Sequence, residues 1–230
     1  MPSAFIQCMI ALFVVITVVL AHIFADPIYM QWFKVNNTDD PTSIYTKTTD
    51  LAKVDPYLII SLIVMIVISI WKIAPQSKLE LVKWHHWFMG IYFIFTTIAF
   101  SGLLTLLLKH IFGRVRPNAN DGSAIWQSFP FEGGYDFLSF PSGHSTTAGA
   151  IAMIVYLFAP RFAVVGFAFA IWIAISRLGV GAHYPADVLA GLAVGSIFTW
   201  IYARSFARKR LLFCFDKQGK LAFREPYGSR

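Results

Sequence analysis

Residues 86–109 of the chain read HWFMGIYFIFTTIAFSGLLTLLLK, an apolar run in which the last residue is the only Lys, Arg, Asp or Glu. A helix needs about 20 such residues to cross the hydrocarbon core of a bilayer. The chain of 230 residues is 57% hydrophobic and 13% charged, whereas soluble domains carry about 25% charged residues. A chain of this composition cannot cover itself with polar surface, so lipid must be the solvent for most of it.

Five further apolar stretches lie on either side of this run. Together they predict six transmembrane helices, at residues 4–25, 56–74, 86–109, 143–159, 162–178 and 186–203. The first stretch lacks the basic start of a signal peptide, so we expect it to be a retained helix. The sequence therefore predicts an all-α integral membrane bundle of about six helices, with a membrane domain at 1–203 and a basic tail at 204–230.

The basic residues predict the orientation of this bundle. Six helices put both termini on one side, and that side carries twelve Lys and Arg residues against seven elsewhere, with eight of the twelve after Tyr202. Because cytoplasmic loops carry an excess of Lys and Arg, we expect both termini in the cytoplasm, where the tail contacts anionic lipid headgroups rather than nucleic acid. The loops at about 26–55, 110–142 and 179–185 then face outward.

The longer outer loops suggest no specific chemistry. Residues 26–55 mix acids, Thr and aromatics, and predict an exposed loop with one amphipathic turn. Residues 118–140 are rich in turn residues, and we expect their aromatic side chains at the headgroup level. Cys8 and Cys214 lie in the first span and in the tail, and they indicate no disulfide framework.

Ionisable residues near a membrane are costly, so each is a candidate for function or for structural pairing. Three clusters lie at the predicted outer face of the bundle: Lys109 with Arg116 and Pro117; Pro141, Ser142, Gly143 and His144; Ser176 and Arg177 with His183 and Asp187. Lys109, Arg116 and Arg177 are expected at one depth. Such cations match phosphate oxygens and predict an anion site that stabilises a phosphoryl group in transfer. The alternative is that each cation reaches the interface alone.

The second cluster is expected to start the fourth helix. Pro141 suits a first helical turn, and Ser142 and Gly143 offer backbone amides and little bulk to an approaching anion. His144 would stand at this positively polarised end, where a protonated imidazole can donate to a leaving-group oxygen. A helix start with a hydrogen-bonded histidine is the structural alternative.

His183 and Asp187 are four residues apart, and Pro185 between them favours the start of the sixth helix. The carboxylate can then lie beside the imidazole, fix its tautomer and leave the other ring nitrogen free to attack phosphorus. A His–Asp pair that only caps the helix is the alternative.

No metal site and no other cofactor is predicted. His85 and His86 are adjacent, point in different directions on a helix and have no carboxylate or thiol cluster beside them. We expect both to anchor near the headgroups. His110 and Arg114 lie near the predicted site, and we interpret them as loop or lipid contacts.

The three clusters, in this order and at these spacings, resemble the signature of the type 2 phosphatidic acid phosphatase family. The resemblance implies that His183 is a nucleophile that forms a phosphohistidine, that His144 protonates the departing oxygen and that Asp187 is the partner of His183. It implies that the phosphoryl oxygens are held by Lys109, Arg116, Ser142, Gly143 and Arg177. Water would then hydrolyse the phosphohistidine, and no metal would be required.

The same signature occurs in soluble vanadate-dependent haloperoxidases, from which the six spans distinguish this chain. The resemblance implies a phosphatase at the outer face of a bacterial inner membrane, acting on phosphatidate, phosphatidylglycerophosphate, undecaprenyl diphosphate or a lipid A phosphate. One alternative is a phosphotransferase that passes the phosphoryl group from His183 to a lipid acceptor. Another is an anion channel or carrier, which leaves both histidines and Asp187 without a task. We expect the lipid to enter sideways between helices.

Overall fold

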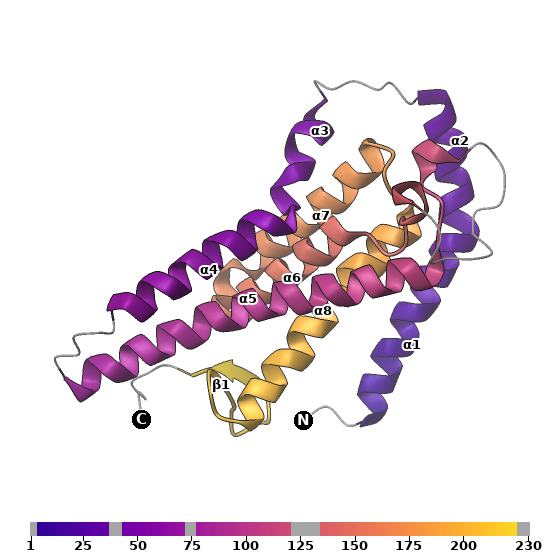
Figure 1. Cartoon of the computed structure of the whole chain (residues 1–230). Helices are drawn as coiled ribbons and strands as arrows, with labels where there is room; N and C mark the ends of the chain where they lie inside the picture. Colours follow the sequence, from indigo (N-terminus) through magenta and orange to yellow (C-terminus); the bar gives the residue numbers. More distant parts are fainter. Residues whose placement is uncertain (1–3, 37–42, 72–76, 121–133, 225–230) are drawn as a thin grey trace.

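The computed structural model describes residues 4–36, 43–71, 77–120 and 134–224, which are mainly helical (Figure 1). The first long helix joins α1 (Ala4–Leu20), a π-helical segment η1 (Ala21–Ala25) and α2 (Asp26–Asn36). The others are α4 (Val54–Trp71), α5 (Lys78–Phe112), α6 (Gly143–Phe158), α7 (Ala163–Gly179) and α8 (Pro185–Arg208). Five of the six are long and apolar enough to cross a membrane, and α6 is a shorter apolar helix. The predicted all-α bundle of about six helices is confirmed.

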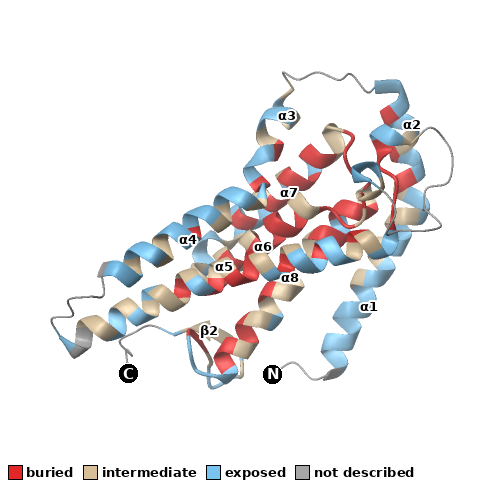
Figure 2. Cartoon of the chain, in the orientation of Figure 1, coloured by how far each residue is buried: buried red, intermediate tan, exposed pale blue. Residues whose placement is uncertain are grey.

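Three helices form the centre of the bundle. In Figure 1, α6, α7 and α8 lie between the α4–α5 pair on one flank and α1–α2 on the other. Figure 2 shows that buried residues concentrate in the central helices, whereas α1 and α4 are mostly exposed. Exposed residues such as Phe13 in α1 and Ile60 in α4 are apolar, as expected for helices that face lipid.

The prediction of an exposed loop at 26–55 is wrong. Besides α2, this stretch contains α3 (Ile44–Thr49) and the 3-10 turn η2 (Asp50–Ala52). Tyr29 and Phe33 of α2 are buried in one cluster with Tyr184. The first helix therefore continues beyond its predicted end because one face of it packs on the bundle.

Glycine ends α5 and sets the spacing between α6 and α8. Gly113 follows α5 with φ 55°, a left-handed conformation that glycine adopts without strain. A Cβ at Gly191 would lie 2.4 Å from Ser142 O, and one at Gly195 would lie 2.0 Å from Thr146 O. Both distances are too short for a side chain, so α8 lies directly against the backbone of α6.

The prediction that Pro141 lies in a first helical turn is wrong. α6 begins at Gly143, and Ser142 is its N-cap, whose Oγ accepts a hydrogen bond from Ser145 N. Serine is favoured at this position because its hydroxyl satisfies an otherwise unpaired backbone donor. Pro141 therefore precedes the helix.

Within its described residues, the segment between α5 and α6 has the 3-10 turns η3 (Pro117–Ala119) and η5 (Tyr135–Phe137). Residues 121–133, which make up much of the predicted turn-rich loop, lie outside the described residues. Another 3-10 turn, η6 (Pro160–Phe162), joins α6 to α7.

A short antiparallel hairpin of β1 (Phe213–Phe215) and β2 (Leu221–Phe223) follows α8. Phe213 is fully buried and packs edge-to-face on Phe93 of α5 and Phe158 of α6. α8 runs through the predicted boundary at residue 203, and the described part of the tail folds onto the bundle. The hairpin and the start of α1 lie at one end of the bundle, and α3 lies at the other (Figure 1).

Candidate active site

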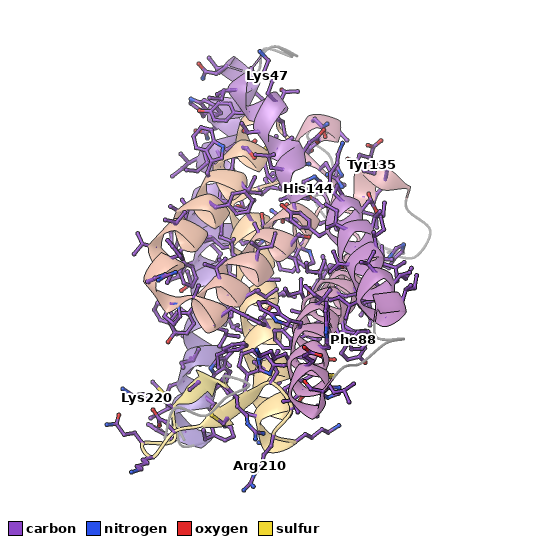
Figure 3. All side chains as sticks on the ribbon, turned by 90° about the vertical axis from the view of Figure 1, so that its left-hand side faces the viewer. Lys47, Phe88, Tyr135, His144, Arg210 and Lys220 are labelled. Carbon is purple, nitrogen blue, oxygen red and sulfur yellow. The ribbon has the colours of Figure 1, made fainter. Side chains whose placement is uncertain are left out.

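The three charged clusters meet at the end of the bundle that carries α3. Lys109 lies in the last turn of α5 and Arg177 in the last turn of α7, while α6 and α8 both begin here. Figure 3 shows His144 toward this end, whereas Arg210 and Lys220 lie at the opposite end. The spans therefore bring together residues that the sequence separates.

His183 lies against Asp187 at the start of α8. The distance from His183 Nδ1 to Asp187 Oδ2 is 3.6 Å, slightly longer than a hydrogen bond, and both side chains are buried. Ser139 Oγ donates to Asp187 Oδ2 at 2.5 Å and lies 3.4 Å from His183 Nδ1. Tyr184 N also donates to Asp187 Oδ2, at 2.9 Å, within a capping box. Asp187 thus faces His183, and Ser139 contacts both.

The environment of His183 favours a neutral imidazole. Burial lowers the pKa of His183 well below its usual value; Asp187 opposes this shift, and the charges of Lys109 and Arg116 add to it. His183 Nε2 lies 3.5 Å from Arg116 Nη1. With Nδ1 turned toward Asp187, the Nε2 lone pair is directed to the cationic side of the site.

Backbone carbonyls hold Arg116 and Lys109. Arg116 Nη1 donates to Ala182 O at 3.1 Å, and its Nη2 donates to Leu138 O at 3.2 Å. Lys109 Nζ donates to the same Leu138 carbonyl and lies 3.3 Å from Ser139 O. Both cations are buried, and one carbonyl oxygen joins them.

Arg177 is anchored from another direction. Its Nη1 donates to Thr49 Oγ1 at 2.7 Å, while its Nε has no hydrogen-bond partner in the described part of the chain. Thr49 is the last residue of α3 and is buried. Trp172 of α7 donates to Thr48 Oγ1 at 3.0 Å, so a second contact holds α3 against the helix that carries Arg177.

The start of α6 lies beside these cations. Ser142 N donates to Asp187 O at 3.0 Å, and a Cβ at Gly143 would lie 3.9 Å from Lys109 Cε. His144 Nε2 is buried and has no hydrogen-bond partner among the residues that the structure describes. This nitrogen is therefore available to a ligand.

A cavity of about 630 Å³ opens beside His144, between α4, α5 and α6. Lys109, Gly143 and His144 line one part of it, and apolar side chains such as Leu58 and Leu103 line much of the rest. An apolar wall with a few polar groups is typical of a site for an amphipathic small molecule. The cavity suits a ligand with an anionic head at the start of α6 and an apolar body between α4 and α5.

Four residues around this site were not predicted: Asp26, Thr49, Arg114 and Ser139. Arg114 is fully buried and donates to Asp187 Oδ1 at 2.5 Å and to Asp26 Oδ2 at 2.6 Å, so its interpretation as a loop or lipid contact is wrong. A second arginine so close to Arg116 was the available signal, because an unpaired charge at the membrane is costly. The His110 ring lies 2.8 Å from the carbonyl of Leu106 in its own helix.

The histidine pair at 85–86 is not part of the site. The His86 ring packs edge-on against Phe223 of the hairpin, with ring centroids 5.2 Å apart. Within the described residues, no group of three or more His, Cys, Asp and Glu side chains is arranged to hold a metal ion.

Comparisons with known sequences show which family the chain resembles. A family model described as the PAP2 superfamily matches residues 90–211, which include all three charged clusters. The chain is 49% identical to a lipid A 1-phosphatase of Rhizobium etli over 127 residues, which are 55% of this chain and 55% of that protein. It is 29% identical to an undecaprenyl-diphosphatase of Sulfolobus acidocaldarius over 111 residues, 46% of this chain and 50% of that protein. The match thus spans about half the length of these curated relatives.

A solved structure supports the same fold. The crystal structure of a transmembrane PAP2-type phosphatidylglycerolphosphate phosphatase from Bacillus subtilis superimposes with a TM-score of 0.59 at 20% identity, covering 88% of this chain and 96% of that one. This likeness and the apolar helices make the chain a multi-pass integral membrane protein. With a family match across more than half of its length, the chain belongs to the PAP2 superfamily.

Proposed function

We propose that the chain is a membrane lipid phosphatase that hydrolyses a phosphomonoester or a diphosphate on a lipid through a phosphohistidine at His183. The observation that carries this proposal is the setting of the His183 ring, which is buried between Asp187 on its Nδ1 side and Arg116, 3.5 Å from its Nε2. A neutral imidazole whose lone pair is directed toward bound cations is suited to attack a phosphoryl group.

In the first step, His183 Nε2 attacks phosphorus, and the bond from phosphorus to the departing oxygen breaks. His144, protonated at that stage, gives its proton to this oxygen, and Asp187 stabilises the charge that forms on the His183 ring. The phosphoryl oxygens are held by Lys109, Arg116, Ser142, Gly143 and Arg177. Preformed charges and amides of this kind stabilise the negative charge of the transition state.

In the second step, water attacks the phosphohistidine, and the bond from phosphorus to nitrogen breaks. His144, now neutral, takes the proton of the water, and inorganic phosphate leaves. His183 then returns to its neutral form. This cycle balances without a metal ion, so we expect activity in the presence of a chelator.

The cavity supports an amphipathic substrate. Its polar part at Lys109 and His144 suits a phosphate, and its apolar walls suit lipid chains that enter sideways between helices. Among the candidate lipids, a lipid A phosphate is favoured, because two relatives at 49% identity are lipid A 1-phosphatases. Undecaprenyl diphosphate, phosphatidylglycerophosphate and phosphatidate are the competing substrates.

We further propose that the termini and the basic segment 204–230 face the cytoplasm, and that the site faces the outer side of a bacterial inner membrane. The described basic residues Arg210 and Lys220 lie at the end of the bundle opposite His144, which agrees with the excess of Lys and Arg in cytoplasmic segments (Figure 3).

The test is phosphate release by the full chain in detergent, with chelator present, from a panel of the four lipids. We expect release from at least one lipid, and loss of release in His183→Ala and Asp187→Asn. Arg161→Gln is the matched control. Arg161 lies in η6, the turn that joins α6 to α7, at the end of α6 opposite the site. This variant should retain activity.

The outcomes separate the competing functions. Phosphate that appears on a lipid acceptor instead of in solution indicates a phosphotransferase. Binding of phosphate without release from any lipid indicates an anion carrier and overturns the proposal. Release that requires added metal overturns the metal-free mechanism.

A further inference from the structure

Arg114 occupies the centre of a buried ion-pair chain that the proposed chemistry does not yet use. Its side chain has no exposed surface. One terminal nitrogen, Nη1, lies 2.5 Å from Asp187 Oδ1, and the other, Nη2, lies 2.6 Å from Asp26 Oδ2. The guanidinium also stacks 4.0 Å from the centre of the Tyr184 ring. Every side of this arginine is thus in contact with protein.

We propose that Arg114 and Asp26 are positioning residues that fix the Asp187 carboxylate in the orientation in which it faces His183. This inference rests on the proposed function, because it assigns Arg114 to the step in which His183 attacks. Neither residue touches the substrate; both act through Asp187.

The two oxygens of Asp187 show why Arg114 matters for orientation. Oδ2 accepts from Ser139 Oγ and Tyr184 N, and it is the oxygen that faces His183 Nδ1. Oδ1 accepts from Arg114. With donors on both oxygens, the carboxylate cannot rotate about its Cβ–Cγ bond without breaking a charge-assisted hydrogen bond in a buried site.

Asp26 holds Arg114 from the opposite side and also contacts the helix that carries Asp187. Asp26 Oδ2 pairs with Arg114, and its Oδ1 accepts from Ala186 N at 3.0 Å, in the first turn of α8. Asp26 is 3% exposed, and His22 Nδ1 lies 3.0 Å from its Oδ2. The first helix is therefore tied to the start of α8 by one carboxylate.

The π-helical segment η1 explains how Asp26 comes to face the bundle. Asp26 N donates to Ala21 O, five residues earlier instead of four. This wider turn changes the phase of the helix, so that the exposed side chains of α1 give way to a buried face in α2. Single π-helical turns within α-helices are frequent at functional sites.

Arg114 differs from Arg116, although the two are only two residues apart. Arg116 lies within 3.5 Å of His183 Nε2, the nitrogen from which attack is proposed. Arg114 has both terminal nitrogens engaged with carboxylates and no exposed surface. A role in binding phosphate therefore falls to Arg116, and a role in orientation falls to Arg114.

The experiment compares Arg114→Gln and Asp26→Asn with the unchanged chain, in detergent, on the best lipid of the panel. We expect kcat to fall by about 10- to 100-fold in Arg114→Gln, by analogy with the loss that follows removal of the hydrogen-bond partners that orient metal-binding histidines. KM and the inhibition constant of inorganic phosphate should change less than about twofold, because the residues proposed to bind phosphate are unchanged. Arg116→Gln should instead weaken phosphate inhibition.

A pH profile separates positioning from a merely structural role. His183 faces Lys109, Arg116, Asp187 and Ser139, and Arg114 partly neutralises the charge of Asp187. Without Arg114 the carboxylate acts more strongly on the imidazole, so the acidic limb of kcat/KM should move to higher pH. A variant that only folds less well would keep the position of this limb.

Asp26→Asn keeps the proposal testable if Arg114→Gln does not fold. We expect a smaller fall in kcat in Asp26→Asn, and no further fall when it is added to Arg114→Gln, because the two act through one contact chain. Folding is followed by melting temperature and by size-exclusion chromatography. Full kcat in a folded Arg114→Gln or Asp26→Asn variant, or weakened phosphate inhibition with normal kcat, overturns the inference while the proposed phosphatase activity stands.

Discussion

Ser142 N donates a hydrogen bond to Asp187 O at 3.0 Å, so the N-cap of α6 and the first turn of α8 are joined directly. Gly191, one turn further along α8, lets the two helices approach this closely, since a Cβ there would lie 2.4 Å from Ser142 O. The start of α6, where phosphate binding is proposed, and the residue whose carboxylate faces His183 are therefore joined by one backbone hydrogen bond.

Gly191→Ala should separate these helix starts. We expect overpacking to lower the free energy of unfolding by about 1–3 kcal/mol and to reduce phosphate release more than stability alone explains. Melting temperature and kcat measure the two effects. Gly90→Ala is the control, because its nearest neighbour would be an ordinary contact with Phe158 at 3.7 Å, and an equal loss in both variants would contradict the prediction.

Thr49→Val should weaken the binding of phosphate. The change keeps the shape of Thr49 but removes the hydroxyl that accepts from Arg177 at 2.7 Å. Hydrogen bonds to charged groups contribute about 1.5–3 kcal/mol, so the inhibition constant of inorganic phosphate should rise by about tenfold or more. Thr17→Val is the control, since the Thr17 hydroxyl donates to Phe13 O within its own helix. An unchanged inhibition constant would mean that the contact of Arg177 with Thr49 does not contribute to phosphate binding.

His144→Gln should reveal a general acid through its dependence on the leaving group. With a lipid alkoxide as leaving group, we expect kcat to fall by about 10²- to 10⁴-fold. An aryl phosphate, whose leaving group needs no proton, should lose far less. His110→Gln serves as the matched control, because the His110 ring lies beside Leu106 O of its own helix. Equal losses with both substrates would assign His144 another role.

Protonation of His183 should destabilise the fold at low pH. Burial holds its pKa well below that of an unfolded histidine, about 6.5, so the unfolded state binds the extra proton first. The contribution of neutral His183 to the free energy of unfolding is therefore fully present above this pH. It is lost as the pH falls, by at most about 1.4 kcal/mol per pH unit. The melting temperatures of the unchanged chain and of His183→Gln should be compared between about pH 5 and about pH 7.5, a range that includes the pKa of an unfolded histidine. The two curves should diverge as the pH falls. Parallel curves would contradict the prediction.

The sequence predicts the six spans well because each depends on a local property, the absence of charge over a helix length. It also predicts that His183 and Asp187 lie together, since they are four residues apart at a helix start. It does not predict the contact of Arg114 with Asp26, which joins residues 88 apart in the chain and depends on the phase change at η1. The Thr49 contact to Arg177 is equally long-range, with α3 lying in a segment whose polarity suggested a loop.

The single carbonyl of Leu138, which accepts from both Lys109 and Arg116, has a further consequence for how an anion is received. Two buried cations repel each other, and gathering them around each incoming phosphate would oppose binding. Here a peptide group already holds them at one spacing, so the repulsion is overcome once, when the chain folds. If the proposed phosphate-binding role of Lys109 and Arg116 holds, the site is preorganised for a multiply charged anion, whose oxygens would take the place of these carbonyl oxygens.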